Sequence, residues 1–184
     1  NGNGGNDVLV GGGDNDTVNG GAGDDIILWR AGDGRDFIDG GANATAAGDL
    51  VHIAGDATAE SFTVYSIAEA ALAGFTPTNA NTEVIVVRNG VVIAELDNIE
   101  ELVINGLGVT TPGGASGGTS QGDTITVSGS FAGTSLNFNT ITIEGGTGND
   151  TVDITGLTSG HRIVFNSGAG TATINLRGFG AART

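Results

Sequence analysis

The sequence has no cysteine and is poor in aromatic and basic residues. The absence of cysteine excludes a disulfide framework. No apolar run is long enough to cross a membrane, so we expect no membrane insertion. Lys and Arg together number 6 against 21 Asp and Glu, which gives a net charge of −15. Such a chain lacks the basic stripe that nucleic-acid-binding proteins need, so we expect no nucleic-acid partner.

Glycine, by contrast, is abundant, with 35 residues in 184. This is well above the usual ~7%. The glycines follow no Gly-X-Y period, which excludes collagen. The excess of carboxylates allows two interpretations: a solvated acidic surface, or side chains that await cations. The spacing of Asp and Gly has to decide between them.

The first fifty residues form an internal repeat of nine residues. Three units follow one another directly, at residues 2–10, 11–19 and 20–28. After a two-residue insertion a fourth unit occupies 31–39, and a fifth, longer unit opens at Gly40 and ends with Asp49 and Val51. The first four units have Asp in the sixth place and an apolar residue in the eighth: Asp7, Asp16, Asp25 and Asp36, with Leu9, Val18, Ile27 and Ile38.

Each unit predicts a six-residue turn followed by a three-residue strand. A strand this short turns one side chain inward, so the units must stack to build a core. Stacking would align the aspartates and the turn carbonyls in a row, and a row of like charges opposes folding unless a cation intervenes. Carboxylate and carbonyl oxygens suit Ca²⁺, whereas Zn²⁺ would want His or Cys, which these turns lack. We therefore expect Ca²⁺ as the cofactor.

These units resemble the hemolysin-type, or RTX, repeats of secreted bacterial proteins, whose signature is GGxGxDxUx. The resemblance covers residues 2–51 and a single unit at 145–153. It implies a right-handed parallel β-roll in which successive strands alternate between two sheets. Turns on one side then come from every second repeat, and each calcium ion lies between two such turns. It also implies export by a type I secretion system and an extracellular or cell-surface location.

The resemblance further implies that aspartates pair across every second turn: Asp7 with Asp25, Asp16 with Asp36, and Asp25 with Asp49. Backbone carbonyl oxygens would complete the ligand sets, and they belong to Gly2, Gly4, Gly11, Gly13, Gly20, Ala22 and Gly32. About three ions are expected, within a range of roughly two to four.

Three positions stand apart from this scheme. Asp14 replaces the fourth-place glycine of its unit. Asp150 stands in a good unit but has no matching neighbour two turns away, so a structural turn is an alternative there. Asp123 is expected to be a turn residue only.

The remaining residues predict further β structure. Strands are expected at 62–65, 83–87, 91–96 and 102–104, with a hairpin around Asn89-Gly90 and a short helix at 67–72. Five short strands between 124 and 176 suit a β-solenoid or a small sandwich. We therefore expect an all-β chain in four segments. They are a calcium-binding roll at 1–55, a β-rich α+β docking unit at 56–110, a linker at 111–120 and a short-strand unit at 121–184.

The favoured hypothesis is a non-enzymatic calcium-binding module for structure and secretion, which folds when it binds calcium. Because the chain opens in mid-pattern, we expect it to be a fragment of a larger parent polypeptide. One alternative is the non-catalytic tail of a secreted RTX enzyme, such as a protease, lipase, epimerase or haem peroxidase. Another is a surface-layer, adhesin or carbohydrate-binding module, which would self-associate in calcium.

Overall fold

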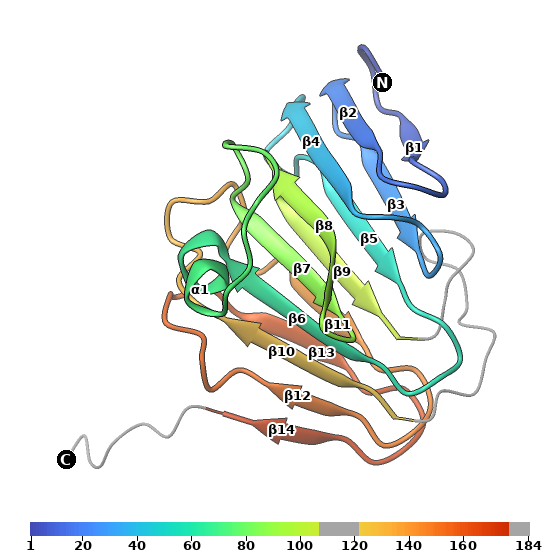
Figure 1. Ribbon diagram of the computed structural model, residues 1–184, viewed down its shortest axis with the longest axis vertical. Coiled ribbons are helices and arrows are strands. Elements are labelled where there is room, and N and C mark those ends of the chain that lie inside the picture. Colours follow the sequence, from blue (N-terminus) through green and yellow to red (C-terminus); the bar gives the residue numbers. More distant parts are fainter. Residues whose placement is uncertain (107–121, 177–184) are drawn as a thin grey trace.

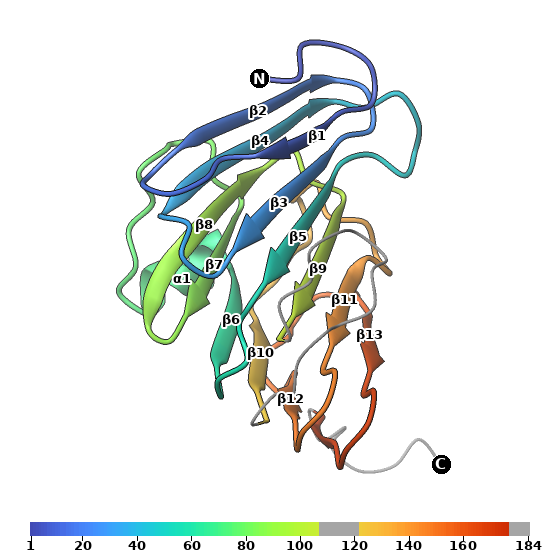
Figure 2. The ribbon, with the colours of Figure 1, turned by 90° about the vertical axis from the view of Figure 1, so that its right-hand side faces the viewer.

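The protein consists of two packed β-sheets in the computed structural model, which describes residues 1–106 and 122–176 (Figures 1 and 2). The six-stranded sheet has the order β1 (Val8–Val10), β3 (Ile26–Arg30), β5 (Leu50–Ala54), β9 (Glu101–Asn105), β11 (Ile141–Glu144), β13 (Ile163–Asn166). The eight-stranded sheet has the order β14 (Thr173–Asn175), β12 (Thr151–Asp153), β10 (Thr124–Ser128), β6 (Ser61–Ser66), β7 (Val84–Arg88), β8 (Val91–Asp97), β4 (Asp36–Ala42), β2 (Thr17–Ala22).

Successive strands alternate between the two sheets from β1 to β6 and again from β9 to β14. Strands two apart in the chain are therefore parallel neighbours, as β1 is with β3 and β3 with β5. The eighth-place residues of the repeats turn into the core, where Ile27 is 0% and Ile38 1% exposed. The prediction of an all-β chain built on a parallel β-roll is confirmed.

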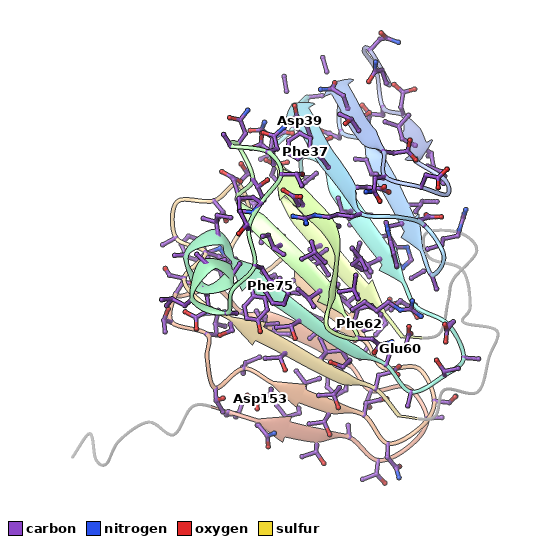
Figure 3. All side chains as sticks on the ribbon, viewed as in Figure 1. Phe37, Asp39, Glu60, Phe62, Phe75 and Asp153 are labelled. Carbon is purple, nitrogen blue, oxygen red and sulfur yellow. The ribbon has the colours of Figure 1, made fainter. Side chains whose placement is uncertain are left out.

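A hairpin interrupts the alternation in the eight-stranded sheet. Strands β6, β7 and β8 pair antiparallel, with Asn89 and Gly90 at positive φ in the turn between β7 and β8. The hairpin therefore separates β4 from β6 with two extra strands, while β5 and β9 remain direct neighbours in the other sheet. Helix α1 (Ile67–Leu72) lies on the outer face of these strands (Figure 1). It packs there through Ala70, beside Phe75 (Figure 3).

One apolar core runs through both sheets, from Val18 on β2 to Val152 on β12. Trp29 lies in it, 1% exposed, and its indole N–H donates to the Gly34 carbonyl oxygen at 3.0 Å. Strands from residues 56–106 thus share both sheets and the core with the repeats. The four segment limits stay a prediction, and the expected linker at 111–120 lies outside the described residues.

The turns of the repeats stack so closely that some glycines have no room for a side chain. A Cβ on Gly20 would overlap the carbonyl oxygen of Gly40 and lie 2.5 Å from Asp25 Oδ2. Gly13 lies in the same array, but a Cβ there would meet nothing within 4 Å. The two positions therefore separate the effect of stacking from that of an exposed turn.

We expect Gly20→Ala to destabilise the folded, calcium-loaded protein by about 1–3 kcal/mol, the usual range for overpacking. Gly13→Ala should change the free energy of unfolding by less than about 0.5 kcal/mol, as surface substitutions do. Chemical denaturation in saturating calcium measures both values. Equal effects of the two substitutions would contradict the stacking seen at Gly20.

Candidate calcium site

Acidic residues stand in three rows at the starts of the parallel strands, and all of them except Asp7 and Asp16 are buried. The first acid row precedes β1, β3, β5 and β9, and consists of Asp7, Asp25, Asp49 and Glu100. The second acid row lies at β2 and β4, and consists of Asp16 and Asp36. The third acid row precedes β6, β10 and β12, and consists of Glu60, Asp123 and Asp150. Figure 3 shows Glu60 at the start of β6.

Within each row, the backbone N–H of one acid donates to the carboxylate of the next. Asp7 donates to Asp25 Oδ1 at 2.7 Å, and Asp25 to Asp49 Oδ1 at 2.6 Å. Asp16 donates to Asp36 Oδ1 at 2.9 Å. The structure therefore brings together all three aspartate pairs that the resemblance implied.

The second carboxylate oxygen of many of these acids is buried without a hydrogen-bond partner. This holds for Oδ2 of Asp7, Asp16, Asp25, Asp49 and Asp150. Buried polar atoms are normally paired, because leaving one unpaired costs free energy, and more so when it is charged. A bound cation or a proton on each of these oxygens would remove this cost.

Although the rows contain up to four acids, their side chains alone do not surround a common point. In the part of the chain that the structure describes, no set of three or more His, Cys, Asp or Glu side chains is arranged to hold a metal ion. A cation at an acid row would therefore need backbone carbonyl oxygens as further ligands. Ca²⁺ accepts such mixed oxygen sets with flexible geometry, so the donor set fits calcium.

The carbonyl ligands implied by the resemblance fall into two groups. Gly2, Gly11 and Gly20 lie against the carboxylates, and a Cβ on Gly11 would be 3.0 Å from Asp36 Oδ2 and 3.3 Å from Asp16 Oδ2. A second set is further from the acids or already engaged. Gly4 and Ala22 form a parallel bridge, while a Cβ on Gly13 or on Gly32 would meet nothing within 4 Å. Calcium ligation by any of the seven carbonyls stays a prediction.

The departures from the repeat signature fit the backbone. Asn3 and Asp14 each have φ of 73°, in the left-handed region that glycine usually occupies. Asn and Asp tolerate this conformation better than other side chains. The substitution of glycine by Asp14 therefore leaves the turn intact.

Sequence reasoning missed Glu100, Glu60 and the neighbour of Asp150. Strand β10 pairs with β12, so Asp123 is that neighbour, and its backbone N–H donates to Asp150 Oδ1 at 2.9 Å. One signal could have found Glu60: it follows Gly55 by five residues, the spacing of Gly2 and Asp7. Glu100 has no glycine at that spacing.

Burial and mutual repulsion disturb the ionisation of several of these acids. Burial raises the pKa of Asp49 to about 6, and the negative charges of Glu100 and Asp25 add to the rise. Burial also raises the pKa of Asp36 and of Asp150. In the folded protein without calcium, these three carboxyls therefore keep their protons to a higher pH than ordinary carboxyls do.

Two buried acids beside the hairpin have arginine partners instead. Arg88 pairs with Glu60, and also with Asp56 at 2.6 Å. Arg35 pairs with Glu95 at 2.8 Å, and Glu95 is 0% exposed. Burial is the largest influence on the pKa of Glu95 and would raise it, but hydrogen bonds from Thr78 and Thr82 lower it overall. These acids are satisfied from within the chain.

The fold is a parallel β-roll in which rows of acidic residues precede the strands. A model of the RTX calcium-binding nonapeptide repeat matches four copies in this chain, over residues 1–28, 30–44 and 142–153. Comparison with curated proteins and with solved structures gave no match. The chain thus carries RTX repeats, as the sequence predicted, and such repeats bind Ca²⁺ as a structural module.

We expect Asp49 to stabilise the calcium-free protein more near about pH 5 than near about pH 7. Asp49 has a raised pKa in the folded state, so its contribution is present below the unfolded value of 3.8 and is lost as the pH rises through about 6. Asp36 and Asp150 shift in the same direction. The amount of β-structure that the metal-free protein retains at the two pH values, measured by far-UV circular dichroism, tests this.

The matched variant for this experiment is Asp49→Asn, which should reduce the difference in stability between the two pH values. The calcium concentration at half-saturation should also rise as the pH falls below about 6, because a protonated carboxyl is a poor ligand. The same pH dependence in Asp49→Asn and in the unchanged chain would contradict the raised pKa of Asp49.

Proposed function

We propose that this chain is a calcium-dependent structural module of a larger extracellular bacterial protein. The observation that carries the proposal is the set of buried, unpartnered Oδ2 atoms at the starts of the repeat strands. In this proposal one Ca²⁺ bridges each aspartate pair, at Asp7 and Asp25, Asp16 and Asp36, and Asp25 and Asp49. That makes three ions within the repeats.

The bridging ions would supply the positive charge that these rows lack. Asp25 is 1% and Asp49 0% exposed, so water does not screen their repulsion well. Without calcium, each added turn places another carboxylate beside the last, which favours the unfolded chain. With calcium, binding free energy becomes folding free energy. The chain would then stay unfolded at the low calcium concentration inside the cell and fold at the high concentration outside, after secretion.

The parent and its activity belong to the same proposal. The repeats themselves are a structural module and not catalytic, so an enzymatic activity of the parent would lie outside them. No helix in residues 1–106 and 122–176 is long and apolar enough to cross a membrane. We assign the module to a secreted or cell-surface protein and expect its contacts to be with the rest of that polypeptide.

We expect a cooperative gain of β-structure when CaCl₂ is added to the chain in chelator, and little gain with MgCl₂, which demands stricter geometry. Asp25→Asn should raise the calcium midpoint by about tenfold or more, the scale on which changes beside a metal ligand act. Asp25 belongs to two pairs, so its loss affects both. Far-UV circular dichroism measures the transition.

Asp14→Asn is the matched control for Asp25→Asn. Asp14 is an exposed turn residue with φ of 73°, which Asn tolerates equally well. Its calcium midpoint should equal that of the unchanged chain. Full β-structure in chelator, with no response to calcium, would sink the coupling of folding to calcium.

We also expect the hairpin region to keep its structure longest when calcium is removed. Its buried acids have arginine partners. In the repeats, by contrast, Oδ2 of Asp7, Asp16, Asp25 and Asp49 is buried without a partner. Hydrogen exchange in chelator should show slow amide exchange on β6, β7 and β8 and fast exchange on β1 to β4. Arg88→Gln should accelerate exchange on β6 and β7 without changing the calcium midpoint of the repeats. Uniform exchange along all these strands would contradict this division.

A further inference from the structure

The first acid row does not end where the repeats end. Strand β5 pairs with β9, so the turn before β9 lies directly beside the turn that contains Asp49. The backbone N–H of Asp49 donates to Glu100 Oε2 at 2.8 Å. Glu100 thus stands to Asp49 as Asp49 stands to Asp25, although the matched repeat residues end at 44 in this part of the chain.

The backbone reproduces the repeat geometry as well. A Cβ on Gly2 would overlap the carbonyl oxygen of Gly20, and a Cβ on Gly20 would overlap that of Gly40. A Cβ on Gly40 would in turn overlap the carbonyl oxygen of Asn98. The Asn98 carbonyl oxygen therefore takes the place that the carbonyl oxygens of Gly20 and Gly40 hold in this row. The backbone conformation differs, because Asn98 has a positive φ of 51° and these two glycines do not.

An unpartnered oxygen faces this same place. Asp49 is 0% exposed, and its Oδ2 has no hydrogen-bond partner. The position of a Cβ on Gly40 would be 2.5 Å from that oxygen and also against the Asn98 carbonyl oxygen. Two oxygens of different turns thus converge on one glycine, and Glu100, 9% exposed, holds the adjoining backbone.

We propose that Asp49, Glu100 and the backbone carbonyl of Asn98 form a further calcium site beyond the repeats. The site rests on the proposed function, since it continues the same row by one ion. Two carboxylates with a backbone carbonyl are hard oxygen ligands, the type that Ca²⁺ prefers. The three-residue segment 98–100, between β8 and β9, replaces a whole six-residue repeat turn.

The test is a count of bound calcium ions by native mass spectrometry, with affinities from isothermal titration of CaCl₂ into the full chain. The variants are Glu100→Gln and the matched control Glu101→Gln. Gln keeps an oxygen that can accept the Asp49 N–H but removes the charge. Glu101 is the adjacent residue on β9 and lies outside the acid rows.

Glu100→Gln should bind one ion fewer than the unchanged chain, while Glu101→Gln binds the full number. An unchanged count and unchanged affinities in Glu100→Gln would overturn the site. If the unchanged chain binds no calcium, the proposed function itself fails. If it binds calcium and only the comparison of variants shows no difference, the failure concerns this site alone.

A second measurement covers the case in which Glu100→Gln does not fold. In the unchanged chain, the side-chain carboxyl ¹³C resonance of Glu100 should shift on addition of CaCl₂, and that of Glu101 should not. A Glu100 resonance that stays constant up to saturation of the other ions would overturn the site without any substitution.

Discussion

The interaction on which the rest depends is the hydrogen bond from the backbone N–H of one turn to the carboxylate two repeat units further on. It uses one oxygen of each acid and fixes the distance between the stacked turns, as at Asp7 and Asp25 or Asp25 and Asp49. It also carries each carboxylate out of water, and so leaves the second oxygen buried and unpaired. The contact that stacks the turns therefore also brings negative charges together out of water. Buried like charges repel strongly, so this arrangement needs a cation between them.

The chain solves this problem in two ways. Where the hairpin brings an arginine within reach, as Arg88 reaches Glu60, the compensating charge is covalently part of the protein and always present. In the repeats, the charge would come from solution, so the stability of the roll would depend on the calcium concentration. A permanent part and a conditional part thus share one apolar core, which runs from Val18 to Val152.

The sequence predicted the repeats well because their spacing is regular. Each nine-residue unit has Asp in its sixth place and an apolar residue in its eighth, as at Asp16 and Val18. These two positions locate the turn, the strand and the core residue at once. The helix at 67–72 and the hairpin at Asn89-Gly90 were also predicted, since both depend on local residues. Asp123 and Glu100 could not be placed in the rows, because their neighbours are set by which strands pair across long insertions.

The hairpin also explains why the rows differ in length. It inserts β7 and β8 beside β4, so the strand next to Asp36 comes from the hairpin, and the second acid row stops there with Arg35 and Glu95 in its place. The six-stranded sheet receives no insertion, so β5 meets β9 and the first acid row continues from Asp49 to Glu100. A roll in which strands alternate without interruption would end both rows together. The number of places for an ion along each sheet therefore follows from the strand order, and not from the number of nonapeptide units alone.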